Sequence, residues 1–126
     1  MSNREHPVIV VADDDPDILE LVVMRLERSG HVVHKAADGD TALGLVEQHQ
    51  PDLAVLDVMM PGLDGYELTR RLREDPAMKD LLIVLLTARV QEGDVDAGLA
   101  SGADDYITKP FSPQALAERI DALLQT

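Results

Sequence analysis

The chain has no cysteine and no tryptophan, and only 2% of its 126 residues are aromatic. Without cysteine, neither a disulfide framework nor a thiolate metal site can form, which suits a cytoplasmic protein. The shortage of aromatic side chains argues against a surface on which nucleic-acid bases stack. No apolar run approaches the roughly 18 residues that a membrane span needs, and residues 1–7 lack the apolar core of a signal peptide.

Basic residues are also scarce. The 11 Lys and Arg residues are outnumbered by 24 Asp and Glu residues, which gives a formal net charge of −13 at pH 7. This charge opposes direct binding to nucleic acid or to an anionic membrane. The length fits a chain that buries its own core, so we expect one domain over residues 1–126, of which residues 1–7 form an N-terminal tail.

Short apolar runs alternate with longer segments of helical periodicity. The runs at 8–12, 53–56 and 81–86 are uninterrupted, which is typical of strands buried on both faces of a parallel sheet. The run at 31–36 is more mixed, as expected nearer the edge of a sheet, and the last strand is predicted at 104–108.

Helix signals separate these runs. Asp15, Asp38 and Ser112 are predicted N-caps, because each is a capping residue followed by Pro or Gly and then by an apolar stripe. A third helix should end before Pro76, and a fourth is expected over 91–101, where two glycines each cost about 1 kcal/mol relative to Ala. Five β/α units with right-handed crossovers predict a single doubly wound α/β domain. This is a three-layer (βα)5 sandwich around a parallel five-stranded sheet in the order 2-1-3-4-5.

Four of the predicted strands end on polar residues: Asp13 and Asp14, Asp57, Thr87 and Lys109. Because parallel strands all end at the same edge of a sheet, these side chains should converge there, where open α/β sheets bind ligands. Three carboxylates in one small site repel by roughly 4 kcal/mol per close pair at an effective dielectric near 20, so a proton or a cation must offset them. Oxygen ligands without His or Cys favour a hard divalent cation, Mg²⁺ or Mn²⁺.

The same residues suggest phosphoryl chemistry. Asp57 is a candidate nucleophile, since a carboxylate can form an acyl phosphate. Lys109 supplies the positive charge that this chemistry needs, and a cis bond to Pro110 would direct its ammonium group back across the strand ends. Thr87 can donate its hydroxyl to a phosphoryl oxygen. Backbone N–H groups expected to contact the same anion are those of Val58, Met59 and Ala88.

Each of these residues has a plainer interpretation when it is taken alone. Asp13 and Asp14 could form a turn and a helix cap, and Thr87 could cap the segment that follows it. A calcium loop starting at Asp13 fails, because its sixth and twelfth positions hold Ile18 and Met24 rather than Gly and Glu. The combination of residues, rather than any one of them, carries the interpretation.

Three functional classes remain open. The favoured one is a binding module controlled by phosphorylation of Asp57. The second is a small aspartate-based phosphatase, although the chain is short for the core and cap of a haloacid-dehalogenase-type enzyme. The third is a degenerate module that only makes protein contacts.

Four motifs, at 10–19, 56–65, 85–88 and 102–111, resemble those of the CheY-like receiver domain of two-component response regulators. They read Val-Val-Ala-Asp-Asp-Asp-Pro-Asp-Ile-Leu, Leu-Asp-Val-Met-Met-Pro-Gly-Leu-Asp-Gly, Leu-Leu-Thr-Ala and Gly-Ala-Asp-Asp-Tyr-Ile-Thr-Lys-Pro-Phe. The resemblance covers residues 8–124. It implies that Asp57 accepts a phosphoryl group from the phosphohistidine of a sensor histidine kinase or a phosphotransfer protein.

The resemblance also implies individual roles. Asp13 and Asp14 would be the metal-binding acidic pair, with the carbonyl of Met59 as a further ligand, and Lys109 would contact the phosphate. Thr87 and Tyr106 would form a switch pair that repacks the surface made by the fourth helix, the last strand and the last helix. That surface would control an output domain or a target protein. Such a domain catalyses only its own phosphorylation and dephosphorylation, so we do not expect a conventional enzyme.

Two side chains should modulate the lifetime of the phosphorylated form. Met59 and Arg89 each lie two residues beyond a site residue, so we expect them to flank the path of a hydrolytic water. Related receivers often dimerise through charged pairs on the surface described above, and Asp105 with Arg119 could form one such pair. Other charged partners are missing, so we expect a monomer, or a dimer built differently, when the chain is unphosphorylated. The positions that lack the expected partners are Val95, Ala100, Ala115 and Asp121.

Overall fold

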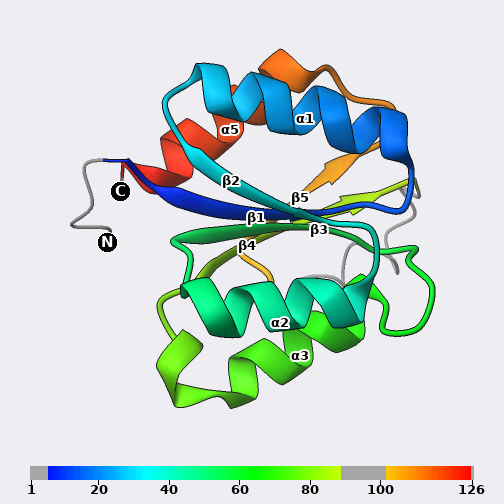
Figure 1. Ribbon diagram of the computed structural model, residues 1–126, viewed down its shortest axis with the longest axis vertical. Helices are drawn as coiled ribbons and strands as arrows, with labels where there is room; N and C mark the ends of the chain where they lie inside the picture. The colour runs from blue at the N-terminus through cyan, green and yellow to red at the C-terminus, as the bar shows by residue number, and fades with distance from the viewer. Residues whose placement is uncertain (1–5, 89–101, 126) are drawn as a thin grey trace.

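The computed structural model describes residues 6–88 and 102–125, and these form a five-stranded sheet between two layers of helices (Figure 1). The sheet order is β2-β1-β3-β4-β5, and neighbouring strands are parallel throughout. The predicted doubly wound fold and its strand order are therefore confirmed. The strands are β1 (Val8–Ala12), β2 (Val32–Ala36), β3 (Leu53–Asp57), β4 (Leu82–Thr87) and β5 (Asp105–Thr108).

Helices cover both faces of the sheet. On one face lie α1 (Pro16–Arg28) and α5 (Pro113–Leu124), and on the other lie α2 (Gly39–His49) and α3 (Gly65–Glu74) (Figure 1). A short 3-10 helix, η1 (Pro76–Met78), follows α3, so the predicted end of the third helix before Pro76 is correct. The fourth helix expected at 91–101 lies outside the described residues.

The helices begin where their capping residues predict. At Asp15 for α1, Asp38 for α2 and Ser112 for α5, the side chain accepts a hydrogen bond from an amide of the first turn. Asp64 caps α3 in the same way. Each such cap contributes about 1 kcal/mol to helix stability. Because α1 and α3 begin soon after β1 and β3 end, these caps also hold the loops at the carboxyl edge of the sheet.

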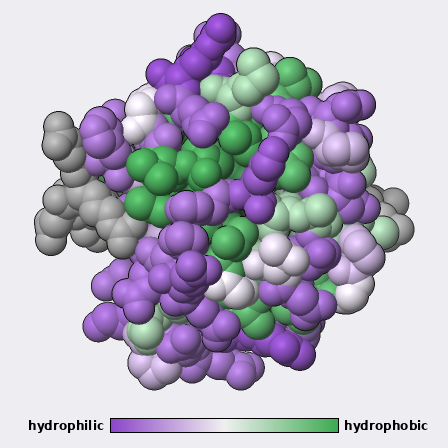
Figure 2. Space-filling model, viewed as in Figure 1, coloured by the Kyte–Doolittle hydropathy of each residue, from purple (hydrophilic) through white to green (hydrophobic). Residues whose placement is uncertain are grey.

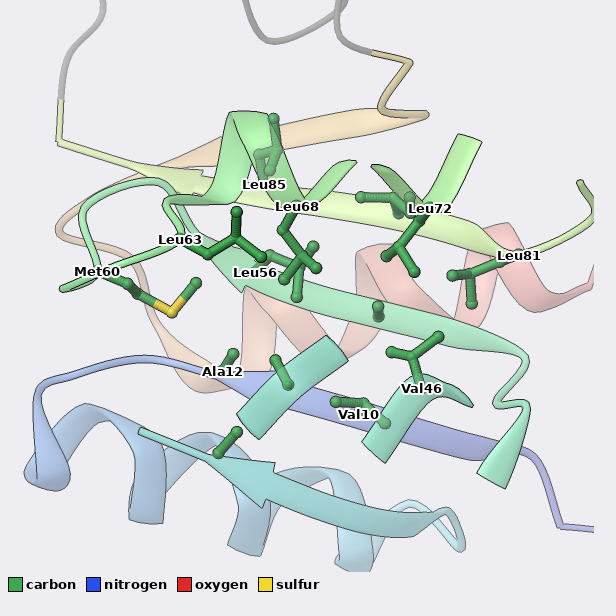
Figure 3. Packing of buried hydrophobic residues seen from close by; sticks show 14 of the residues in the cluster. Val10, Ala12, Val46, Leu56, Met60, Leu63, Leu68, Leu72, Leu81 and Leu85 are labelled. Carbon is green, nitrogen blue, oxygen red and sulfur yellow. The ribbon is translucent and has the colours of Figure 1, made fainter. Parts of the chain in front are cut away.

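Two hydrophobic layers attach the helices to the sheet. Leu56, Leu68 and Leu72 belong to the layer under α2 and α3 (Figure 3), and Val55 and Leu116 belong to the layer under α1 and α5. Every residue of β3 is buried, whereas all four residues of β5 are only partly buried. Full burial of a Leu or Val side chain contributes about 1.5–3 kcal/mol, so the central strand is held more firmly than the edge strand.

The outer surface is mostly polar. Hydrophilic residues cover most of the face shown in Figure 2, and hydrophobic residues gather between the helix layers there. Val32, on the edge strand β2, is 45% exposed. Among the described residues, no helix combines the length and the apolar character that a bilayer crossing requires.

Candidate functional site

The carboxyl ends of β1 and β3 bring three acids together. Asp57 ends β3 and Asp13 directly follows β1, and they are only 3% and 1% exposed. Asp14, next to Asp13, is exposed. One carboxylate oxygen from each of the three lies within 4.8 Å of the others. The convergence expected from parallel strand ends is present in the structure.

Lys109 reaches into this acidic group from the loop after β5. Its Nζ lies 3.0 Å from Oδ2 of Asp13 and 3.1 Å from Oδ2 of Asp57. Its backbone N–H donates to the carbonyl of Thr87 at 2.7 Å, which continues the β4–β5 pairing beyond the end of β5. The bond between Lys109 and Pro110 is cis. Lys109 therefore links the β5 side of the site to the acids on β1 and β3.

Burial and charge set the ionisation of the site. Burial raises the pKa of Asp57 to about 6, with a further contribution from the negative charge of Asp13, while Lys109 acts in the opposite direction. Burial acts to lower the pKa of Lys109, but the close polar contacts with Asp13 and Asp57 and their negative charges outweigh this, so the pKa of Lys109 is raised. The ammonium group is thus held charged beside carboxylates that one cation alone does not fully offset.

The donor set fits a hard divalent cation. All three candidate ligands are carboxylates, and neither His nor Cys belongs to the group. Oδ2 of Asp13 is fully buried and forms an ion pair with Lys109, but within residues 6–88 and 102–125 it accepts no well-aligned hydrogen bond. Mg²⁺ is usually bound through one or two carboxylates, with waters and phosphate oxygens completing the octahedron. Asp13, Asp14 and Asp57 are therefore the residues that would hold such an ion.

The predicted switch residues lie on the neighbouring pair of strands. Thr87, 7% exposed, ends β4 and pairs with Thr108 of β5. Tyr106 lies opposite Leu85, two residues earlier in the same pairing, and packs against the hydrophobic layer under α2 and α3. Because strand residues two apart share a face, Thr87 and Tyr106 lie on the same side of the sheet.

The expected anion-binding amides differ in their present partners. The N–H of Met59 donates to Oδ1 of Asp57 at 3.2 Å, whereas the N–H of Val58 donates to the carbonyl of Leu86 at 2.9 Å. Of these two amides, the one from Met59 faces the Asp57 carboxylate. The side chain of Met59 is 65% exposed, as a position beside the site requires. Ala88 is exposed at the end of β4, and Arg89 lies outside the described residues.

Two features of the site were not predicted from the sequence. A Cβ atom at Gly65 would lie 2.6 Å from the carbonyl oxygen of Asp57, so the start of α3 packs directly on the backbone of the candidate nucleophile. An apolar groove of about 390 Å³ also lies beside Lys109, between α1 and the start of α5. The signal for this groove was Leu21, an apolar residue that lies outside the buried stripe of α1 and is 54% exposed. The residues lining the groove are Ile18, Leu21, Val22, Ala88, Lys109, Pro110, Phe111 and Pro113.

Charged residues considered for a dimer contact are engaged within the chain. Nη1 of Arg119 lies 2.7 Å from Oδ2 of Asp105, so this ion pair joins α5 to β5 of the same chain. Oδ1 of Asp121 lies 2.8 Å from Nε2 of His31. Val95 and Ala100 lie outside the described residues. The monomeric state expected before phosphorylation stays a prediction.

Comparison with known proteins gives a consistent family. The family model of the response regulator receiver domain matches residues 9–121. The chain is 48% identical over 117 residues to the alkaline phosphatase synthesis transcriptional regulatory protein PhoP of Bacillus subtilis. This match covers 93% of the chain and 48% of PhoP, so the chain spans about half the length of this relative.

Solved structures agree with this match. The chemotaxis response regulator CheY4 of Vibrio cholerae has a TM-score of 0.89 at 29% identity, covering 94% of this chain and 98% of that one. The BeF3-activated receiver domain of DrrB, a Thermotoga maritima protein, has a TM-score of 0.86 at 35% identity, covering 96% and 99%. With the family model matching most of its length and the acids, hydroxyl and lysine assembled at one sheet edge, the chain belongs to the response regulator receiver domain family.

Proposed function

We propose that this domain is a signalling switch in which Asp57 accepts a phosphoryl group with the help of Mg²⁺ or Mn²⁺. The observation that carries the proposal is the position of the Asp57 carboxylate. It ends a fully buried strand, and it lies within 4.8 Å of ligand atoms on Asp13 and Asp14 and 3.1 Å from Nζ of Lys109. A buried carboxylate flanked by a cation and a metal-binding acid pair is arranged for attack on phosphorus.

The transfer is a displacement at phosphorus. A carboxylate oxygen of Asp57 forms the new P–O bond while the P–N bond of a donor phosphohistidine breaks, and the bonding electrons leave with the imidazole nitrogen. A bound divalent ion would supply charge neutralisation for the phosphoryl oxygens. Lys109 pairs with another of these oxygens in place of its present contact with Asp57, and the Met59 amide donates to the same group.

The response involves the β4–β5 side of the site. Phosphorylation adds about −1.5 to −2 charge and three acceptor oxygens next to the end of β4. Thr87 is placed to donate its hydroxyl to these oxygens, and the Tyr106 ring, on the same side of the sheet, fills the space that Thr87 leaves. The surface of β5 and α5 is repacked as a result, and an output domain or target protein reads this change.

The phosphoryl donor is a sensor histidine kinase or a phosphotransfer protein. Its binding surface on this chain is the apolar groove beside Lys109, together with the exposed Leu21 of α1. An apolar groove next to the reacting carboxylate suits a helical donor that presents its phosphohistidine at the rim.

Incubation with radiolabelled acetyl phosphate tests the proposal. We expect label to be incorporated with Mg²⁺ and to be lost in chelator or after Asp57→Asn. Asp80→Asn removes an exposed acid at the opposite end of the sheet and should leave labelling unchanged. Absence of label in the unsubstituted chain would favour the degenerate module, and repeated turnover of free phosphate esters would favour the phosphatase.

A further inference from the structure

Arg73, in the last turn of α3, joins three separate parts of the chain. Its Nε donates to the carbonyl of Gly102 at 2.8 Å, and its Nη1 donates to the carbonyl of Leu81 at 2.7 Å. Its Nη2 donates to Oδ2 of Asp104 at 2.8 Å. The planar guanidinium therefore binds the chain just before β4 and just before β5 at the same time. Its side chain is 22% exposed, so these charge-assisted hydrogen bonds are only partly screened by water.

The partners of Arg73 are built around this contact. Gly102 has a φ of +108°, in the region of positive φ that favours glycine. A Cβ atom at Gly102 would lie 2.7 Å from Cγ of Arg73, so glycine also makes the close approach possible. Oδ2 of Asp104 accepts a second hydrogen bond, from the N–H of Ile83 at 2.8 Å, and the N–H of Asp104 donates to the carbonyl of Ile83 at 2.9 Å. Asp104 thus attaches the start of β5 to β4 through both its backbone and its side chain.

β5 needs such an attachment. It has only four residues, all of them partly buried, and among the described strands it pairs with β4 alone. A short edge strand with little buried apolar surface opens at low free-energy cost. Yet this strand carries Tyr106 and leads directly into Lys109, whose ammonium lies 3.1 Å from the Asp57 carboxylate and must stay beside it to pair with the phosphoryl group.

We propose that Arg73 is a positioning residue for the phosphoryl site: with Asp104 it clamps the start of β5 to β4 and α3, and so holds Lys109 in register at the other end of the strand. The clamp and Lys109 lie about 16 Å apart along the chain, at the rise of an extended strand. The effect is transmitted by the β4–β5 pairing, which begins at Val84 and Asp105 and ends with the Lys109 N–H bond to Thr87. Tyr106 lies between the two ends, so it can change position while the start of β5 stays attached to β4.

Arg73→Gln tests this role, with Arg70→Gln as the matched control. Arg70 lies one turn earlier on the same helix, is 55% exposed and pairs with Glu67 of its own helix. Amide hydrogen exchange reports on three probes: the N–H of Asp104 at the clamp, the N–H of Lys109 at the site, and the N–H of Asp13, bonded to Ala36 on the far side of the sheet. The rate of label uptake from acetyl phosphate is measured in the same proteins.

We expect Arg73→Gln to lower protection at Asp104 and Lys109 by about tenfold or more, the scale of a lost charge-assisted hydrogen bond, while Asp13 is unchanged. Label uptake should fall by about threefold or more because Lys109 is less often in place. Arg73→Lys, which keeps the charge without the fork, should recover part of both losses, and Arg70→Gln should change neither.

Loss of protection at Asp104 alone, with Lys109 and label uptake unchanged, would reduce Arg73 to a local loop contact and overturn the proposal. An equal loss at all three amides would also overturn it, because that pattern is general destabilisation. If Arg73→Gln does not fold, Arg73→Lys and Asp104→Asn decide by the same criteria. The expected effect on label uptake rests on the proposed function. If the proposed function fails, the unsubstituted chain takes up no label, and the exchange measurements still report on the contact of Arg73 with Asp104.

Discussion

β3 and β5 carry the two sides of the site, but the fold holds them in opposite ways. β3 pairs with a strand on each side, and all five of its residues are buried, including Asp57. β5 lies at the edge of the sheet, and its four residues are all partly buried. Carboxylates that share a metal ion must keep fixed positions, whereas a switch needs an element that can move at low cost. The packing thus matches a division of the site into two halves. The rigid half is the acidic end of β3 with Asp57, and the responsive half is the edge strand β5 with Tyr106.

The largest expected effect comes from breaking the rigid half. Leu56, fully buried in β3, packs in the hydrophobic layer under α2 and α3 (Figure 3). Leu56→Ala should lower the free energy of unfolding by about 2–5 kcal/mol, measured by urea denaturation. Ile107→Ala, in the partly buried β5, should cost only about 1 kcal/mol. Equal losses would show that the two strands are held with similar strength and that the comparison fails.

Lys109 is the contact between the two halves, so its removal tests whether they work as one site. Lys109→Gln removes the charge that lies 3.0 and 3.1 Å from Asp13 and Asp57. The rate of label uptake from acetyl phosphate should fall by about 100-fold, the usual cost of losing one preorganised charge stabiliser. The control is Lys35→Gln, at an exposed lysine of β2 that pairs with Glu20. Label uptake that survives Lys109→Gln unchanged would mean that the acids act without the β5 side.

The buried charge of Asp57 in the rigid half destabilises the folded state, and this effect can be measured. Burial, with the charge of Asp13, raises the pKa of Asp57 from 3.8 to about 6, so the fold disfavours its ionised form. The destabilisation is fully present above pH 6, declines as the pH falls from 6 to 3.8, and is absent well below 3.8, where Asp57 is protonated in both states. Asp57→Asn should therefore raise the free energy of unfolding by about 1–3 kcal/mol at pH 7 in chelator.

The pH dependence of this gain gives its test. The difference between Asp57→Asn and the unsubstituted chain should shrink between pH 6 and pH 4 in denaturant titrations, and Mg²⁺ should also reduce it by offsetting the charge. Asp80→Asn, at an exposed position, should show no such trend. A constant difference across this range would mean that ionisation of Asp57 is not the cause of the lower free energy of unfolding in the unsubstituted chain.

The framework of this molecule is largely predictable from the sequence, and the reason is physical. Uninterrupted apolar runs mark strands buried on both faces, and capping residues such as Asp15 and Ser112 mark helix starts through local hydrogen bonds. The convergence of Asp13, Asp57 and Lys109 follows from one property of parallel strands, that they end at the same edge. These signals are local in the chain or follow from topology.

Contacts of long polar side chains are not predictable in this way. Arg70, Arg71 and Arg73 lie within four residues on one amphipathic helix, and no periodicity distinguishes the one that binds Gly102, Leu81 and Asp104. Arg119 and Asp105 were considered as partners across a dimer, yet they pair within the chain because α5 packs beside β5. The Val58 amide similarly continues the β3–β4 pairing, which depends on strand register rather than on sequence pattern.

The smallest expected effect concerns the opposite edge of the sheet, where β2 pairs with β1 alone among the described strands. His34 of β2 stacks on His49 of α2 with ring centroids 3.7 Å apart. Burial and the nearby His49 lower the pKa of His34 below 6.5, so the folded chain favours the neutral form of this residue. The contribution of His34 to the free energy of unfolding is therefore fully present above pH 6.5 and is lost as the pH falls through the lower folded-state pKa. His34→Gln should therefore reduce the fall in Tm between pH 7.5 and pH 5.5 by about 1–3 °C, whereas His6→Gln, at an exposed residue, should not. An identical fall in all three proteins would mean that the stacked His34 and His49 do not make the β2 edge sensitive to pH.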